Sequence, residues 1–232
     1  MPGTIVSGGL IRETRSLRAV AAPLPYTETW TVGDHAGLNG DKSWTMGASG
    51  WTVASQAAQL TNNGFAASRG QCNVDCGTDD YQATVTLLTY TPDIVGLLSA
   101  GPCVRMPGDA SLNFYTAVLV SSGGSSPVAM LFKFVGGVQT QLGPTSAPLL
   151  FHVGMTLTVR AVGSSIRLLV DGAPTVSVTD TELPTGRFAG IQGVATGGNF
   201  VRLDNLNVAV ATGGITRVPL ELLSLTPYAG VR

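Results

Sequence analysis

Residues 156–180, which read TLTVRAVGSSIRLLVDGAPTVSVTD, decide the fold of this chain. At its start Leu157, Val159 and Ala161 alternate with polar residues. A period of two is typical of strands that have one buried and one solvated face. The runs are separated by pairs such as Asp171-Gly172, which tolerate the positive φ angles of tight turns. We therefore expect consecutive antiparallel strands.

The composition extends this expectation to the whole chain. Among 232 residues there are 30 glycines and 13 prolines, which favours many short strands over helices. Residues 93–99 are the only short helical candidate in the body of the chain. Residues 127–142 read as a hairpin turning at Gly136-Gly137, and residues 51–60 read as another. The length fits one large β-sandwich with flanking arms.

Several segments resemble strands of concanavalin A-like (LamG- or pentraxin-type) jelly-roll domains, a fold also found in tailed-bacteriophage virion proteins. They are GWTVASQAAQL (50–60), YQATVTLLT (81–89), the strand pair at 101–120, the Asp-Gly turn and strands at 166–193, and LDNLNV (203–208). The resemblance implies an all-β, two-sheet antiparallel jelly-roll sandwich over residues 27–211. It is weak for function, because the family includes lectins, glycosidases and structural modules.

The two ends of the chain read differently from this body. We expect residues 1–26 to form an N-terminal arm and residues 212–232 a C-terminal tail. The arm mixes apolar residues with arginine, as interfaces do, and its predicted partner-binding residues are Leu10, Ile11, Arg12, Arg15, Leu17 and Arg18. The alternative is an unstructured terminus.

Charge and hydropathy exclude some partners. The net charge is −1 and no run of basic residues exists, so no nucleic-acid footprint is visible. No apolar run reaches the length of a membrane span, and the N-terminus lacks the apolar region of a signal peptide. Charged residues make up only 12% of the chain, which favours self-association or docking on an assembly. The alternative is a surface rich in Gly, Ser and Thr.

The patterns that carry catalysis are not found. Hydrolases of the resembled family place carboxylates at alternate positions of one strand, in a pattern like E-x-D-x-x-E. The nearest match is residues 179–182 (Thr-Asp-Thr-Glu), which lie at a strand end before Pro184. No G-x-S-x-G elbow and no dinucleotide or P-loop fingerprint occurs. The sequence therefore predicts a protein that is not an enzyme.

Calcium is the one cofactor that the sequence leaves open. Several proteins of the resembled fold bind it through loop carboxylates and carbonyls. The preferred candidate ligands are Asp75, Asp79 and Asp80, and a second cluster is Asp34, Asn39 and Asp41. The alternative is that these side chains build their loops through Asx-turns.

The three cysteines, Cys72, Cys76 and Cys103, cannot all pair with one another. A small disulfide loop between Cys72 and Cys76, or a metal site, is one interpretation. Reduced structural cysteines are the favoured one, because further ligands with local zinc spacing are missing.

Two functions compete. The first is a structural virion protein, made in a host cytoplasm, that decorates a capsid or joins a tail. It would dock through its arms on partners such as a major capsid protein and form a homo-oligomer, perhaps a trimer. The second is a carbohydrate-binding, lectin-like module that stacks a glycan on Trp44, Tyr90 and Tyr115. The alternative for these three rings is packing inside the sandwich.

Overall fold

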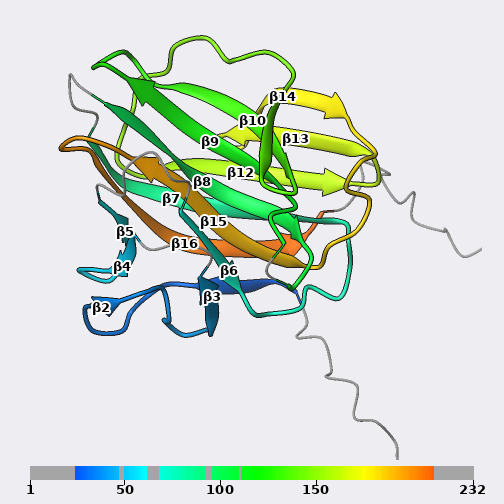
Figure 1. Ribbon diagram of the computed structural model, residues 1–232, viewed down its shortest axis with the longest axis horizontal. Coiled ribbons are helices and arrows are strands. Elements are labelled where there is room, and N and C mark those ends of the chain that lie inside the picture. Colours follow the sequence, from blue (N-terminus) through cyan, green and yellow to red (C-terminus); the bar gives the residue numbers. More distant parts are fainter. Residues whose placement is uncertain (1–23, 47–49, 62–67, 92–95, 110, 212–232) are drawn as a thin grey trace, which may run out of the picture.

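The computed structural model describes residues 24–46, 50–61, 68–91, 96–109 and 111–211 (Figure 1). All regular structure in these ranges is β-strand, so the predicted all-β class is confirmed. Nothing in these ranges is a helix long and apolar enough to cross a membrane. The partner-binding residues predicted in the arm, and the whole tail, lie outside the described residues.

Sixteen strands follow one another within the described residues. They are β1 (Tyr26–Glu28), β2 (His35–Ala36), β3 (Trp44–Met46), β4 (Trp51–Val53), β5 (Ala58–Leu60), β6 (Ser68–Cys72), β7 (Tyr81–Thr91), β8 (Leu97–Met106), β9 (Phe114–Ser122), β10 (Val128–Val135), β11 (Val138–Leu142), β12 (Met155–Val162), β13 (Ser165–Val170), β14 (Ala173–Thr179), β15 (Phe188–Ala195) and β16 (Phe200–Val210).

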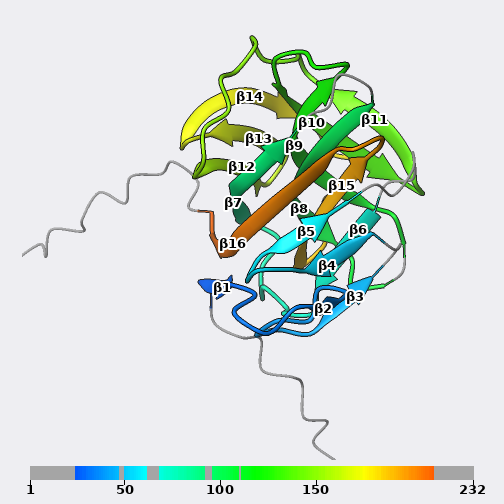
Figure 2. The ribbon, with the colours of Figure 1, turned by 90° about the vertical axis from the view of Figure 1, so that its left-hand side faces the viewer.

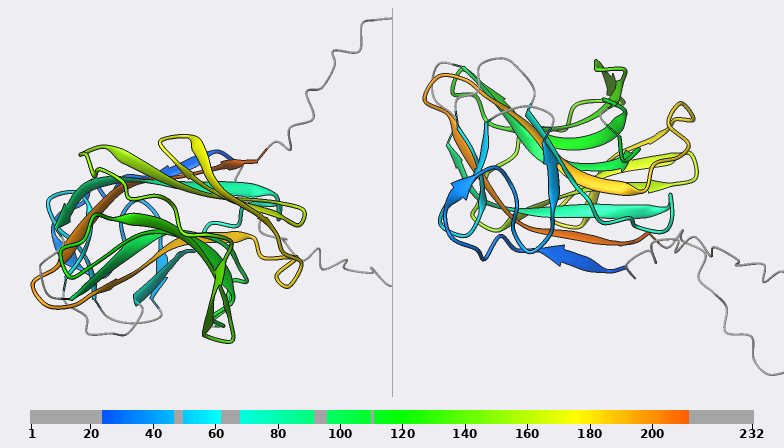
Figure 3. Two further views of the ribbon diagram at one scale, coloured as in Figure 1. Left: turned by 90° about the horizontal axis from the view of Figure 1, so that it is seen from above. Right: turned by 60° about the horizontal axis from the view of Figure 1, so that its bottom comes forward.

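These strands form two antiparallel sheets that pack face to face (Figures 2 and 3). The nine-stranded sheet has the order β14-β13-β12-β7-β16-β5-β4-β2, and β1 pairs with another part of β16. The seven-stranded sheet has the order β11-β10-β9-β8-β15-β6-β3. The predicted two-sheet antiparallel sandwich is thus confirmed.

The sheet pairings also test the local predictions. Both predicted hairpins form, because β4 pairs with β5 and β10 pairs with β11. The predicted helix at residues 93–99 is wrong in its described part. Residues 97–99 open strand β8, which is bonded on one side to β9 and on the other to β15. This pairing between distant segments overrides the local propensity.

The two sheets differ in how much of their outer faces is exposed to solvent. Along β7 buried and half-buried residues alternate, as expected when one face is wet. Along β8 and β6 almost every residue is buried, and most of β9 is too. The middle strands of the seven-stranded sheet are therefore buried on both faces, whereas β11 at its edge is exposed.

A buried glutamate organises the first loop. Glu28 is 0% exposed, and its carboxylate accepts the backbone N–H groups of Trp30, Asp41 and Lys42 at 2.8–3.0 Å. It also accepts the indole N–H of Trp44 at 3.2 Å. These donors replace the water that a buried carboxylate loses. The loop between β1 and β3 is thereby closed around one side chain.

We expect Glu28→Gln to lower the free energy of unfolding by about 2–4 kcal/mol. The amide NH₂ would face N–H donors in place of one acceptor oxygen. Urea unfolding followed by tryptophan fluorescence measures the change. Glu182→Gln is the control, since that side chain is half-exposed and should cost at most about 1 kcal/mol. Equal effects of both substitutions would contradict this role of Glu28.

The turn between β13 and β14 carries a second carboxylate contact. Asp171 has a φ of 49° and Gly172 one of 76°, as the predicted Asp-Gly turn requires. The Asp171 carboxylate accepts the N–H of Thr156 at 2.8 Å and lies 3.0 Å from Nε2 of His152. The hydrogen bond to Asp171 raises the pKa of His152 above its usual value.

This contact predicts a pH dependence. Because the folded pKa of His152 is raised, the contact stabilises the fold below the unfolded value of about 6.5. That contribution is lost as the pH rises through the folded pKa. An NMR titration of His152 should give a lower pKa in Asp171→Asn than in the unaltered protein. The difference in urea midpoint between the two should shrink as the pH rises from below about 6.5 through the folded pKa of His152. An unchanged His152 pKa in the variant would refute the pairing.

Candidate functional site

The outer face of the seven-stranded sheet is the candidate site. This sheet arches so that its hollow side faces away from the other sheet (Figure 3, left). Tyr115 and Ala117 on β9 point into the sandwich core. Because side chains alternate along a strand, Phe114 and Thr116 point outward.

The outer face is apolar at one end. Cys103, Met106, Phe114 and Phe134 form a buried cluster separate from the main core, and Phe132 and Phe188 pack against it half-buried. The rings of Phe114 and Phe134 are stacked, with centroids 4.6 Å apart. An apolar cluster of this kind on the outside of a sandwich provides a surface for a partner or a ligand.

Next to this cluster the face holds a cavity, here called the groove, of about 260 Å³. Its walls come from β8, β9, β10, β11 and β15, and are formed by Leu97, Ser99, Val120, Met130, Phe132, Gln139, Gln192 and Val194. Its volume is near the lower end of the roughly 300–1,000 Å³ typical of ligand sites. One aromatic ring, two amides and a hydroxyl on an apolar wall are a combination suited to a polyhydroxylated ligand.

Two amides on this face are incompletely bonded. Gln192 on β15 and Gln71 on β6 are each 3% exposed, and in the described structure their Oε1 atoms have no hydrogen-bond partner. Gln192 lies directly opposite Arg69, and Gln71 is the diagonal neighbour on the same face. A buried polar atom without a partner costs about 1–3 kcal/mol, so a ligand that donates a hydrogen bond would recover free energy here.

A connection closes one end of the same face. Arg69 Nη1 donates to the carbonyl of Ser111 at 2.6 Å, which holds the β8–β9 connection over β6. Gly136 N–H donates to the side chain of Asn113 at 2.7 Å, and Gly137 N–H donates to the carbonyl of Leu112. The β8–β9 connection is thus tied to strand β6 and to the turn between β10 and β11.

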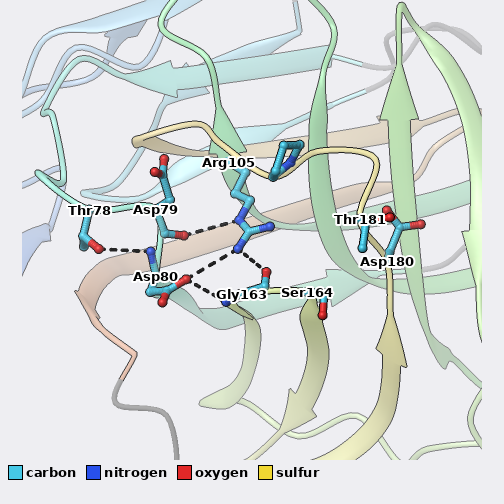
Figure 4. A pocket seen from close by; sticks show the side chains of 9 residues that line it. Thr78, Asp79, Asp80, Arg105, Gly163, Ser164, Asp180 and Thr181 are labelled. Carbon is cyan, nitrogen blue, oxygen red and sulfur yellow. Dashed lines mark hydrogen bonds and ion pairs between the residues drawn. The ribbon is translucent and has the colours of Figure 1, made fainter.

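A second cavity, the arginine cavity, lies at the end of the sandwich (Figure 4) and has a volume of about 360 Å³. It is lined by Thr78, Asp79, Asp80, Arg105, Gly163, Ser164, Asp180, Thr181 and Pro184. Arg105 is 1% exposed and has a φ of 58°, so its backbone is in the left-handed region.

The polar groups of the arginine cavity bond to one another. The guanidinium of Arg105 donates to the carbonyls of Asp79, Gly163 and Leu183 at 3.3, 2.5 and 2.8 Å, and lies 3.6 Å from the Asp80 carboxylate. The Asp80 carboxylate also accepts the N–H of Gly163 at 2.7 Å. Arg105 therefore holds together three segments that are distant in the sequence, and we assign it a structural role.

Asp180 and Glu182, the two acids that come nearest to the catalytic carboxylate pattern, are also bonded within the protein. Asp180 and Glu182 both contact Lys133 Nζ, at 2.6 and 2.5 Å. Asp180 also accepts the hydroxyl of Tyr115 at 2.6 Å. The hydrogen bonds that Lys133 donates to Asp180 and Glu182 raise the pKa of Lys133. The cluster joins β10 to the segment after β14 and so links the two sheets.

The three aromatic residues predicted to bind a glycan lie in the core. Trp44, Tyr90 and Tyr115 are 7%, 5% and 0% exposed. The polar group of each ring donates a hydrogen bond within the protein: the indole N–H of Trp44 to Glu28, the hydroxyl of Tyr90 to the carbonyl of Leu98, and the hydroxyl of Tyr115 to Asp180. Their positions favour packing, and a ligand contact by them stays a prediction.

The predicted calcium ligands are used by the protein itself. Asp75 forms an ion pair with Arg187 at 2.8 Å, and Asp79 accepts the N–H of Gly186 at 2.9 Å. In the described ranges no three His, Cys, Asp or Glu residues come together as a metal site.

The side chains of the second cluster are also bonded within the protein, to partners 5 to 21 residues away and not in Asx-turns. Asp34 accepts the N–H of Ser55, Asn39 accepts that of Trp44, and Asp41 accepts the hydroxyl of Thr29.

The three cysteines are free and buried, as the favoured interpretation predicted. Burial raises the pKa of Cys72 to about 11 and that of Cys76 and Cys103 to about 12. These thiols are protonated at neutral pH, and Cys103 belongs to the apolar cluster of the outer face.

Sequence reasoning missed the residues of the groove. Met130, Phe132 and Phe134 alternate with Leu131 and Lys133, and this shared face was visible in the sequence. Gln192 gave no such signal, because it is a single amide among glycines.

Comparison with known proteins agrees with the fold. No protein-family profile and no curated protein sequence matches this chain. Among solved structures, the carbohydrate-binding module CBM66 from Bacillus subtilis aligns with a TM-score of 0.58 and 16% identity, over 72% of this chain and 96% of that one. The apo Crh5 transglycosylase aligns with a TM-score of 0.56 and 16% identity, over 81% and 84%. The exoplasmic/lumenal domain of VIP36, bound to Ca²⁺ and Man3GlcNAc, aligns with a TM-score of 0.54 and 15% identity, over 75% and 86%.

These matches correct one prediction. The chain was expected not to be an enzyme, but a transglycosylase has the same fold. The absence of the carboxylate pattern is therefore not enough to exclude an enzyme. The matches give no support to a bacteriophage, capsid or tail assignment. At these identities they show the fold alone: a two-sheet jelly-roll sandwich shared by a carbohydrate-binding module, the exoplasmic/lumenal domain of VIP36 and a transglycosylase.

Proposed function

We propose that this chain is a carbohydrate-binding, lectin-like module and that the glycan lies in the groove on the outer face of the seven-stranded sheet. The observation that carries the proposal is the buried amide of Gln192. It lines the groove, and its Oε1 has no hydrogen-bond partner in the described structure. A sugar hydroxyl is the donor that this oxygen needs.

The groove offers the further contacts of a sugar site. The ring of Phe132 is half-buried and can pack against the apolar face of a sugar ring. Gln139 and Ser99 stand on opposite sides of the groove, with amide and hydroxyl groups for other hydroxyls. The fold supports the proposal as well, since CBM66 is a carbohydrate-binding module and VIP36 was solved with Man3GlcNAc.

The virion role receives no comparable support. Its attachment arm and its tail lie outside the described residues, and a capsid partner, a trimer and residence in a virion stay predictions. Calcium stays a prediction too, although VIP36 was solved with Ca²⁺.

The test is glycan binding by the full chain and two groove variants. The first step is an array that includes laminaritetraose and Man3GlcNAc, which are bound in solved structures of this fold. Calorimetry with the best binder then compares the unaltered protein with Phe132→Ala and Gln192→Ala. We expect each substitution to weaken binding about tenfold or more, because an apolar contact or a buried hydrogen bond is lost.

The control is Gln82→Ala on β7, whose half-buried side chain lies on the outer face of the other sheet. It should bind as the unaltered protein does. Circular dichroism shows whether each variant keeps its strands. The proposal fails if no glycan binds, or if a glycan binds equally well to both groove variants.

A further inference from the structure

A third cavity, the turn cavity, lies close to one end of the groove. It has a volume of about 400 Å³ and is lined by Gln59, Thr61, Gly197, Gly198, Asn199 and Phe200. These residues come from β5, from the turn between β15 and β16, and from the start of β16. Phe200 begins the eleven-residue strand β16, whose far end leads to Ala211 beside Asp80. The turn cavity is therefore at the opposite end of the sandwich from the arginine cavity.

The β15–β16 turn separates the turn cavity from the groove. Val194, near the end of β15, lines the groove, and Gly197 lines the turn cavity three residues later. On the groove side, Leu97 N–H donates to the hydroxyl of Thr196 at 2.7 Å, and Thr196 N–H donates to the carbonyl of Leu97 at 3.0 Å. Three residues span at most about 10 Å, so the backbone segments at the two cavities are close. Gln59 and Phe200 point outward from the nine-stranded sheet, whereas the groove lies on the seven-stranded sheet, so a ligand that reaches both passes over this end of the sandwich.

The turn between them is held in place. Asn199 is 2% exposed, and its amide donates to the carbonyl of Thr196 at 2.5 Å. Gly96 packs so closely that an added Cβ would lie 2.7 Å from that carbonyl. Because its φ is +117°, any other residue there would also be strained. A fixed turn keeps the spacing between the cavities constant, as a site for a repeating ligand requires.

The lining of the turn cavity has the chemistry of a sugar subsite. Phe200 is half-buried and presents a ring, while Gly197 and Gly198 are exposed and add no side chains. The side chain of Gln59 is half-buried and makes no hydrogen bond within the described residues. The turn cavity therefore has an aromatic ring and an amide, the two kinds of side chain that Phe132 and Gln192 bring to the groove from β10 and β15.

We infer that the turn cavity is a second subsite for the same glycan, so that the ligand is an extended oligosaccharide that crosses the β15–β16 turn. This inference rests on the proposed function of the groove. The groove binds one part of the oligosaccharide at Phe132, and the turn cavity binds a more distant part of it at Phe200. Linking the two contacts makes the second binding event intramolecular, so affinity rises with chain length.

The experiment measures affinity against chain length, with the best-binding glycan of the array prepared as a series from disaccharide to hexasaccharide. For the unaltered protein we expect the affinity to rise steeply once the chain reaches both cavities. Phe200→Ala and Gln59→Ala should weaken hexasaccharide binding by about tenfold and change disaccharide binding by less than about twofold. Gln59→Ala is the safer variant, because it breaks no hydrogen bond of the fold. Gln82→Ala again serves as the control.

The outcomes separate the two proposals. If Phe132→Ala abolishes binding at every length while the turn-cavity variants bind all lengths normally, the groove is the site and the present inference is wrong. If two disaccharides bind per chain independently, the cavities are separate sites and the continuous subsite is also wrong. If the turn-cavity variants lose binding but Phe132→Ala does not, the proposed groove is wrong.

Discussion

The burial of both faces along the middle strands of the seven-stranded sheet is the constraint on which the rest of the structure depends. An antiparallel sheet in a sandwich normally has one packed and one wet face, as β7 has. Strands β6 and β8 instead bury both faces. The inner face packs on the nine-stranded sheet, and the outer face gathers Phe114, Phe134 and Met106 into its own cluster. A sheet of this kind is rigid and places outward side chains in fixed positions.

Hydrogen-bond satisfaction distinguishes the cavities that follow from this architecture. In the arginine cavity the guanidinium of Arg105 and the Asp80 carboxylate have partners from the protein. In the groove, Gln192 is as deeply buried but lacks a partner for Oε1 in the described structure. Buried polar atoms in folded proteins are rarely left unpaired. Tyr26 Oη and Gln71 Oε1 share this lack, but of these three residues Gln192 is the one that lines the groove, which is why we propose a ligand there. A carboxylate-rich cavity is thus the structural feature, and an amide-lined groove is the functional candidate.

The fold was predictable because its signal is local. The alternation in residues 156–180 and the Asp171-Gly172 turn fix consecutive strands within a few residues of one another. The groove was not predictable, since its walls are assembled by pairings such as Gln192 with Arg69 and Gly101. These partners are about a hundred residues apart, and which face of each strand turns outward depends on the register. Residue type alone predicted a glycan contact for Trp44, Tyr90 and Tyr115, which are buried. Tyr and Trp side chains also suit a protein core that supplies a hydrogen-bond partner for the hydroxyl or the indole N–H.

The comparison with solved structures leads to the same separation of scaffold from chemistry. One jelly-roll sandwich is found in a carbohydrate-binding module, in the exoplasmic/lumenal domain of VIP36 and in a transglycosylase. In the present chain the hollow face of the seven-stranded sheet points away from the core (Figure 3). In this chain that face carries an aromatic ring, amides and a hydroxyl. Side chains of these types can hydrogen-bond hydroxyls and pack against the apolar face of a sugar ring, so the proposed glycan site rests on the side chains and not on the fold.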